Sequence, residues 1–196
     1  MALILASRST HRAQMLARAG VTFEVRAASV DERAVENALG PDVTPADRAE
    51  VLARVKAEAV SEHEPGATVI GCDQILELDG SILHKADTMA DARRRLLALQ
   101  GRTHTLHSAI CLVRDGETIW STVVPAHMTM RSLTPKAIGH YLADAGDAIL
   151  GSVGCYQIEA HGIRLFETID GDWWTIVGLP LLPLLAALRA NALLTD

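Results

Sequence analysis

The sequence predicts an α/β fold in which helices flank a mixed β-sheet. Short apolar runs alternate with amphipathic stretches, which is typical of strands joined by crossover helices. Asp79-Gly80 and Asp115-Gly116 each separate two strand-like runs, and such dipeptides favour antiparallel hairpins. No internal repeat, low-complexity segment or linker interrupts the 196 residues. We therefore expect a single domain spanning residues 1–196.

The chain is expected to begin with a strand, a tight turn and a helix. The apolar run 2–6 predicts a buried strand, and the amphipathic stretch 13–19 predicts a helix. Between them lies the hydroxyl-rich segment Ser7-Arg8-Ser9-Thr10-His11-Arg12. Ser9 or Thr10 can cap the helix, because a hydroxyl oxygen can accept from the free N–H groups of its first turn.

The later elements follow from the same signals of periodicity, capping and turns. A strand is expected over 21–27, a helix with Thr44 as cap and Pro45 at its first position to about residue 61, and a strand over 67–72 that ends at Asp73. We then expect a hairpin of 75–78 and 82–83, a helix over 88–99, a longer hairpin of 103–113 and 118–130, a helix from Thr134 to about 143, and a last helix from about 180.

Composition narrows the classes of partner and compartment. The formal net charge of −6 argues against a nonspecific nucleic-acid binder, which needs a basic surface. The three cysteines are far apart, as expected of buried thiols in a reducing compartment. The first apolar run is too short for a signal peptide, and prolines and an arginine interrupt the apolar run 179–194. We expect a soluble cytoplasmic protein with neither a membrane nor a nucleic acid as partner.

The turn at residues 7–12 has the features of an anion site. A helix N-terminus presents backbone N–H groups and the positive end of the helix dipole, and Arg12 lies one turn into the helix. A phosphate is the anion that fits these donors best. An ordinary capped helix with surface arginines explains the same segment equally well.

Several charged residues elsewhere could act on such an anion. Asp73 follows the apolar strand, where a carboxylate can hold a metal ion or accept a proton from water, or can simply form a turn. Asp31 and Glu32 could bind a hard cation or begin a helix. Lys56 lies on or near the apolar stripe of its helix, which is costly unless its ammonium meets an anion or reaches solvent at the edge of the stripe. Lys85 lies on a loop, where most lysines are solvated.

His104 and His107 form a poor metal site. Their spacing in a predicted strand directs the two rings to opposite faces of the sheet.

Motifs in a fixed order resemble the Maf family of nucleoside triphosphate pyrophosphatases over essentially the whole chain. The matching motifs are Leu3-Ile4-Leu5-Ala6-Ser7-x-Ser9-x-x-Arg12, Asp31-Glu32, Lys56-Ala57, Ile70-Gly71-Cys72-Asp73-Gln74, Lys85, Leu99-x-Gly101-Arg102-x-His104, Gly154-Cys155-Tyr156-x-Ile158-Glu159 and Gly178-Leu179-Pro180-Leu181. The resemblance implies a Maf/ITPase-like mixed sheet with two lobes around a central cleft, and it suggests a homodimer. It also implies hydrolysis of a nucleoside triphosphate to the monophosphate and pyrophosphate with Mg²⁺, Mn²⁺ or Co²⁺, a reaction that cleanses the nucleotide pool.

The resemblance further implies a role for each matching residue. The residues expected to bind the triphosphate are Ser7, Ser9, Arg12, Lys56 and Lys85. Asp73 would be the general base, and Glu32 and Asp73 the metal ligands. Charge neutralisation and an activated water are what attack on an α-phosphorus requires.

Two further positions are expected to line the base pocket by resemblance. Gln74 and Glu159 stand where members that act on 7-methyl-GTP usually carry Gln and Glu, whereas dTTP- and UTP-type members usually carry Thr and Gln. A carboxylate accepts from guanine N1–H and the 2-amino group, but faces the O4 acceptor of a pyrimidine, at a cost of about 1–3 kcal/mol. A dTTP/UTP-type enzyme, or a nucleotide-binding regulator of septum formation, is the alternative. Thr10 and His11 replace the family's usual Pro-Arg.

Overall fold

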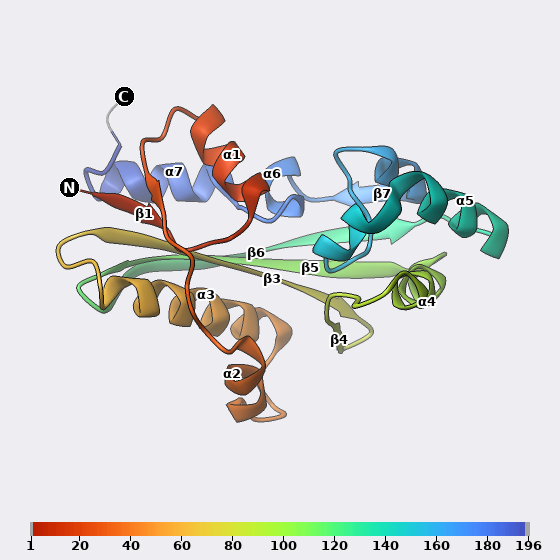
Figure 1. Cartoon of the computed structure of the whole chain (residues 1–196), viewed down its shortest axis with the longest axis horizontal. Coiled ribbons are helices and arrows are strands. Elements are labelled where there is room, and N and C mark those ends of the chain that lie inside the picture. Colours follow the sequence, from red (N-terminus) through yellow and green to blue (C-terminus); the bar gives the residue numbers. More distant parts are fainter. Residues whose placement is uncertain (1, 195–196) are drawn as a thin grey trace. The chain divides into compact units, whose positions relative to one another are not determined.

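The computed structural model describes residues 2–194, and in it helices flank a mixed sheet (Figure 1). The strands are β1 (Leu3–Leu5), β2 (Glu24–Val25), β3 (Thr68–Leu78), β4 (Ser81–Leu83), β5 (Thr103–Arg114), β6 (Glu117–Met130) and β7 (Phe166–Asp170). The α-helices are α1 (Thr10–Arg18), α2 (Glu32–Ala38), α3 (Pro45–Ser61), α4 (Met89–Leu99), α5 (Pro135–Ala145), α6 (Trp173–Ile176) and α7 (Leu181–Ala190). Two 3₁₀ helices, η1 (Gly146–Gly151) and η2 (His161–Leu165), complete the described elements. The predicted α/β class is confirmed.

The strands are hydrogen-bonded in the order β2-β1-β3-β5-β6-β7, and β4 pairs with β3. The chain forms two compact units. The first unit comprises Met1–Gln74, Ser108–Val124 and Asp172–Asp196, and the second comprises Ile75–His107 and Pro125–Gly171. Three boundaries between the units therefore fall within the long strands β3, β5 and β6, and the fourth falls just after β7.

In the first unit, parallel strands form the centre. β1 pairs in parallel with β2 and β3, with Leu5 opposite Ile70. In Figure 1, α3 lies on one face of these strands and α1 and α7 lie on the other. Apolar side chains of β1, β3, β5, α1 and α7 form one buried cluster on the α1 and α7 face, and its members include Leu5, Leu16, Ile70, Leu112, Leu184 and Leu188.

Small residues let α3 approach β3 closely. Ala53 and Ala57 are fully buried on the sheet-facing side of α3. They face Gly71 of β3, where an added Cβ would lie 2.1 Å from the Ala53 carbonyl oxygen and 2.8 Å from the Ala57 Cβ. Such distances leave no room for a side chain, so the glycine determines how near the helix lies to the strand.

The second unit is built on antiparallel pairs. The end of β3 pairs with β4, with Leu76 opposite Leu83, and β6 pairs with β7. The predicted turn Asp79-Gly80 is confirmed, with φ values of +49° and +79° that suit a hairpin turn. A buried aromatic group, His104, Tyr156 and Phe166, lies in the core of this unit.

Most predicted helices are confirmed, and Thr44 and Ser9 are caps as expected, whereas Thr88 and Thr134 prove to be caps at the predicted helix starts. Thr44, Thr88 and Thr134 each accept from the backbone N–H three residues later, as does Ser9 at the start of α1. The helix α1 begins at Thr10, directly after its Ser9 cap, so it starts where the expected cap placed it and three residues ahead of the amphipathic stretch 13–19. The hairpin of β5 and β6 is also confirmed.

Two strand predictions are wrong in extent. The strand expected over 21–27 is reduced to Glu24–Val25, both exposed, at the edge of the sheet. The strand expected to end before Asp73 instead continues as β3 to Leu78, so Asp73 does not lie at a strand end. The polar pair Asp73-Gln74 does not interrupt the strand because each side chain finds polar partners inside the fold.

The remaining expectations on composition concern thiols and membranes. Cys72, Cys111 and Cys155 are buried and unbridged, as predicted. Within residues 2–194, no helix has both the length and the apolar character that crossing a bilayer requires.

Candidate active site

An ion-pair cluster joins three of the predicted site residues in the first unit. The Lys56 Nζ lies 2.6 Å from the Asp73 Oδ1 and 3.0 Å from the Glu32 Oε1. The side chains of Lys56 and Asp73 are only 13% and 10% exposed, whereas that of Glu32 is 51% exposed. Of the two interpretations of Lys56, the structure supports the one in which its ammonium meets anions, and these are the two carboxylates.

The fold accounts for this placement. Lys56 is next to Ala57 on α3, and the close approach of α3 to Gly71 brings its stem toward β3. Strand alternation places Asp73 on the same face as Gly71, toward α3. Glu32 is the first residue of α2, whose cap is Asp31, which accepts from the Ala34 N–H at 3.0 Å. Asp31 therefore begins a helix, which was one of its two interpretations.

The turn before α1 is tightly organised. The Ser7 Oγ accepts from the Ser9 N–H at 3.2 Å, and the Ser9 Oγ accepts from the Arg12 N–H at 3.3 Å. The first turn of α1 thus has its Ser9 cap, one of the two caps that the sequence offered.

Arg12 ties this turn to two other segments. Its Nε donates to the Gly178 carbonyl oxygen at 2.7 Å, and its Nη1 donates to the Cys72 carbonyl oxygen at 3.0 Å. The guanidinium is therefore hydrogen-bonded to β3 at Cys72, the residue before Asp73, and to the segment between α6 and α7 at Gly178. This structural role was not anticipated from the sequence, although Gly178 belongs to a motif that was singled out.

Gln74 has a defined orientation in the first unit. Its Nε2 donates to the Ser108 Oγ at 2.9 Å and to the carbonyl oxygens of Thr175 and Ile176, both at 3.1 Å. The Ser108 hydroxyl donates a hydrogen bond to the Thr175 carbonyl oxygen at 2.8 Å, so the Ser108 Oγ is the acceptor in its contact with Gln74. Three acceptors thus surround the amide nitrogen, and the amide carbonyl Oε1 is the atom left to meet a ligand.

Lys85 and Glu159 belong to the second unit. Lys85 lies in the exposed loop between β4 and α4, as predicted. Glu159 is an exposed residue in the turn before η2.

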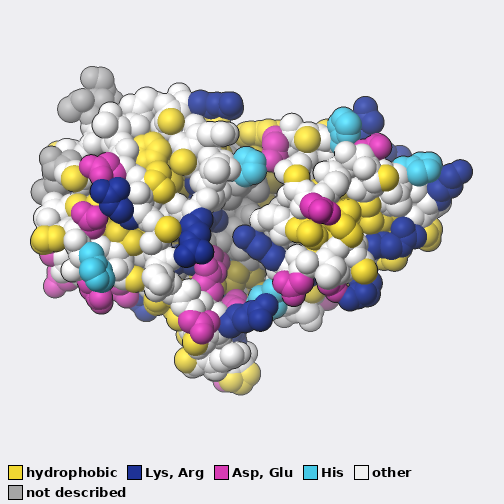
Figure 2. Space-filling view, in the orientation of Figure 1, with side chains coloured by type: hydrophobic (Ala, Val, Ile, Leu, Met, Phe, Trp, Pro, Cys, Tyr) yellow, Lys and Arg dark blue, Asp and Glu magenta, His cyan; other side chains and the backbone are white. Residues whose placement is uncertain are grey.

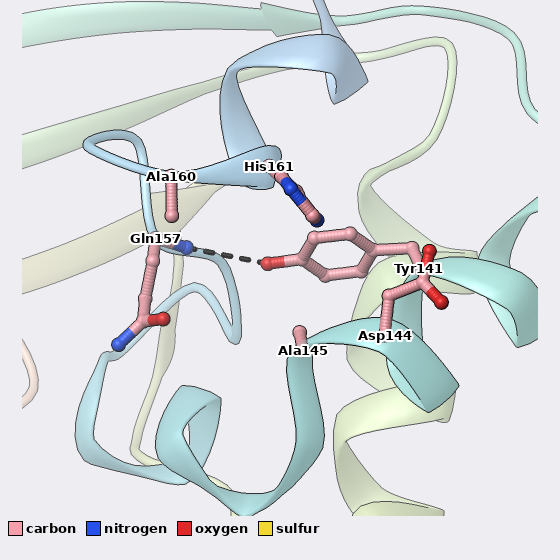
Figure 3. A pocket seen from close by; sticks show the side chains of 6 residues that line it. All are labelled: Tyr141, Asp144, Ala145, Gln157, Ala160 and His161. Atoms are coloured by element: carbon pink, nitrogen blue, oxygen red, sulfur yellow. Dashed lines mark hydrogen bonds between the residues drawn. The ribbon is translucent and has the colours of Figure 1, made fainter.

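A cavity of about 180 Å³ lies beside the Glu159 turn (Figure 3). Its lining residues come from α5, the Glu159 turn and the start of η2, and they are Tyr141, Asp144, Ala145, Gln157, Ala160 and His161. The Tyr141 hydroxyl accepts from the Gln157 N–H at 3.3 Å, which fixes the turn two residues before Glu159. Burial raises the pKa of Tyr141, so this hydroxyl stays protonated at neutral pH.

The two histidines of β5 do not form a metal site, in accord with the prediction. His104 is buried and its Nε2 lies 2.7 Å from the Tyr156 hydroxyl, whereas the His107 Nε2 lies 2.8 Å from the Glu77 Oε2. Burial lowers the pKa of His104 to about 4, so the ring is neutral at physiological pH.

The acidic residues can offer two ligands to a cation. Both Glu32 and Asp73 have an oxygen within 3.0 Å of the same ammonium nitrogen, so the two carboxylates converge on one point. Within residues 2–194, no group of three or more His, Cys, Asp or Glu side chains is arranged to hold a metal ion. Two carboxylates fit Mg²⁺, which is commonly held by one or two carboxylates together with substrate phosphates and water.

Charges on the visible surface are mixed. In Figure 2, basic and acidic side chains are interspersed, and no broad single-sign patch covers the face that is drawn. On this face, the basic groups available to an anion are individual residues rather than an extended basic surface.

Comparisons with known proteins agree with the expected resemblance. The family model described as Maf-like protein matches residues 2–191. A protein of Brucella abortus named 7-methyl-GTP pyrophosphatase is 55% identical over 188 residues, which cover 95% of this chain and 94% of that protein. A protein of Mesorhizobium japonicum with the same name is 57% identical over the same shares of the two chains. A nucleoside triphosphate pyrophosphatase of Nitrobacter winogradskyi is 51% identical over 193 residues, which cover 98% of this chain and 95% of that one.

Proposed function

Since this chain belongs to the Maf-like protein family, we propose that it hydrolyses a nucleoside triphosphate to the monophosphate and pyrophosphate. The observation that carries the proposal is the cluster of Lys56 with Asp73 and Glu32. An ammonium and two carboxylates that converge in a largely buried place suit the attack of water on a charged phosphate.

In the proposed reaction, Asp73 accepts a proton from the water that attacks the α-phosphorus, and pyrophosphate leaves. Lys56 has three N–H donors, and its two carboxylate contacts leave one that can reach a phosphate oxygen. Ser7, Ser9 and the first turn of α1 bind the phosphates from the side of the helix dipole. Arg12 supports that turn through its bonds to the backbone and adds positive charge. Lys85 supplies a further ammonium.

Glu32 and Asp73 would hold a divalent cation, for which Mg²⁺ and Mn²⁺ are the first candidates and Co²⁺ a third. Such a cation supplies further neutralisation of the triphosphate charge. The convergence of the two carboxylates supports this assignment.

For the base, we propose guanine or a modified guanine such as 7-methylguanine. The fixed amide of Gln74 presents an acceptor, and the Glu159 carboxylate is also an acceptor. Guanine offers N1–H and a 2-amino group as donors, whereas uracil and thymine place acceptors on both sides of a single N–H. The relatives named 7-methyl-GTP pyrophosphatase support the same choice. Hydrolysis of such nucleotides would keep them out of newly made nucleic acid.

The reaction is tested by pyrophosphate release from a panel of nucleotides with Mg²⁺ or Mn²⁺. We expect Asp73→Asn to lower kcat by at least about 100-fold, the usual contribution of a general base. Asp42→Asn, at an exposed loop position, is the matched control and should leave the rate unchanged. Equal release by wild type and Asp73→Asn would eliminate the proposed base. No release from any nucleotide would favour a nucleotide-binding regulator instead.

The base preference is tested with the same panel extended to 7-methyl-GTP, GTP, ITP, UTP and dTTP. Loss of the 2-amino group in ITP should lower kcat/KM relative to GTP by about tenfold, which corresponds to one hydrogen bond to a charged group. Glu159→Gln should raise the relative activity on UTP and dTTP. A wild-type enzyme that prefers UTP or dTTP would contradict the assignment and favour the pyrimidine alternative.

The compartment, the partners and the oligomeric state of the protein are separate proposals. Three unbridged, buried cysteines support a reducing compartment, and we propose the cytoplasm. The net charge of −6 supports the absence of a nucleic-acid partner. A homodimer is proposed from the family resemblance alone, and sedimentation velocity of the purified chain tests it.

A further inference from the structure

The loop that carries Lys85 is fixed by a residue of α4. The Arg95 guanidinium donates through Nη2 to the His84 carbonyl oxygen at 2.5 Å, and through Nη1, in a shorter contact, to the Val153 carbonyl oxygen. His84 directly precedes Lys85. A single side chain therefore joins the Lys85 loop to a second loop, residues 152–156, within the second unit.

A second contact fixes the other side of Lys85. Ala86 and Cys155 are both buried; burial raises the pKa of the Cys155 thiol, and the backbone N–H of Ala86, acting as a hydrogen-bond donor to it, lowers that pKa. Cys155 has φ of +56°, a left-handed conformation that non-glycine residues adopt only where neighbouring contacts hold them. The Ser152 hydroxyl provides such contacts, because it donates to the Tyr156 carbonyl at 2.9 Å and accepts from the Tyr156 N–H at 3.1 Å.

These contacts leave Lys85 exposed between two anchored neighbours. The side chain of Lys85 extends from the surface, whereas the backbone on each side of it is tied to the 152–156 loop. A lysine that serves only solubility does not require a fixed backbone. A lysine that meets a ligand binds more tightly when its loop is already ordered, because the ordering cost is not incurred on binding.

Arg95 differs in this respect from the other arginines of α4. Arg94 is exposed and pairs with Asp91 on the same helix, and Arg93 is exposed and donates to the Pro135 carbonyl oxygen at 3.3 Å. Arg95 is half-buried, and burial lowers its pKa. Its hydrogen-bond acceptors are neutral backbone oxygens, so Arg95 joins the two loops through the geometry of its N–H donors rather than through its charge.

We propose that Arg95 is a positioning residue for triphosphate binding, which acts with Cys155 to hold the backbone on both sides of Lys85. The inference rests on the proposed role of Lys85 in binding phosphates. The hydrogen bonds of Arg95 go to the two loops, so Arg95 need not contact the substrate.

Binding of inorganic triphosphate, measured by calorimetry, tests the inference without a base and without turnover. We expect Arg95→Ala to raise the Kd about tenfold, close to the effect of Lys85→Ala, and Arg94→Ala to leave it unchanged. Arg95→Lys keeps the charge but can reach only one of the two carbonyls, so its Kd should lie between those of wild type and Arg95→Ala. With a nucleotide substrate, KM should rise similarly while kcat changes by less than about threefold, as expected when binding alone is weakened.

Hydrogen exchange of the free protein supplies a readout of the loop itself. The amides of residues 84–86 should exchange at least about tenfold faster in Arg95→Ala than in wild type or Arg94→Ala. If Arg95→Ala does not fold, Cys155→Ala and Cys155→Ser replace it, because serine retains an acceptor for the Ala86 N–H and alanine does not.

The possible failures are distinguishable. Unchanged triphosphate affinity, or unchanged exchange at 84–86, in Arg95→Ala would overturn the inference while the proposed function stands. A large fall in kcat with unchanged KM would also overturn it. A wild-type protein that neither binds triphosphate nor releases pyrophosphate would instead refute the proposed function.

Discussion

Replacing Gly71 by alanine is expected to destabilise the protein by about 3 kcal/mol. The new Cβ would lie 2.1 Å from the Ala53 carbonyl oxygen, 2.8 Å from the Ala57 Cβ and 2.8 Å from the Cys111 sulfur. Overpacking of a core usually costs about 1–3 kcal/mol. The upper end applies here because the nearest atom belongs to the backbone of α3 and cannot rotate away.

Urea unfolding followed by tryptophan fluorescence measures this loss. Gly40→Ala is the control, since no atom lies within 4 Å of the added Cβ there, and its free energy of unfolding should stay within about 0.5 kcal/mol of wild type. Movement of α3 away from β3 would also separate Lys56 from Asp73, so pyrophosphate release should fall in the native protein. A free energy of unfolding for Gly71→Ala within 0.5 kcal/mol of wild type would refute the close-approach argument.

Three other perturbations test separate parts of the fold. Burial lowers the pKa of His104 to about 4, so unfolding takes up a proton between that pH and the ordinary value near 6.5. The free energy of unfolding should therefore fall by about 3 kcal/mol as the pH is lowered through this window, and His104→Gln should remove most of that slope in urea titrations. Burial raises the pKa of Cys72 to about 11 and that of Cys111 to about 12, so iodoacetamide at pH 8 should leave both thiols unmodified until urea is added, as mass spectrometry would show. Thr88→Ala removes the cap of α4 and should cost about 1 kcal/mol, whereas no measurable loss in urea would mean that the cap is dispensable.

The helices could be predicted well because their signals are local. Thr44, Thr88 and Thr134 each stand at a cap, and the cap geometry depends only on the next three residues. The two Asp-Gly turns are local in the same way. The short helix α6 was not predicted, and α2 was only one of two interpretations of Asp31 and Glu32, because four to seven residues give too little periodicity to recognise.

The long-range contacts of the site could not be predicted from periodicity. Asp73 and Gln74 look like the end of a strand, and only the distant partners Lys56 and Ser108 explain why β3 continues through them. Ser108 is a buried polar residue directly before the apolar run 109–113 of β5, which was the available signal for its role. Gln74 also donates to the backbone oxygen of Thr175, and Arg12 donates to that of Gly178. No side-chain pattern in the sequence reveals acceptors that belong to the backbone.

The alternation of β3 has a consequence for how such a protein can diversify. Asp73 faces α3 and its lysine, whereas its neighbour Gln74 faces Ser108 and the carbonyl oxygens of α6. A single codon change at position 74 therefore alters one side of the sheet and leaves the ion pair on the other side in place. Under the roles proposed above, a substitution at position 74 can change the contacts made to the base, while the carboxylate proposed as the general base keeps its place.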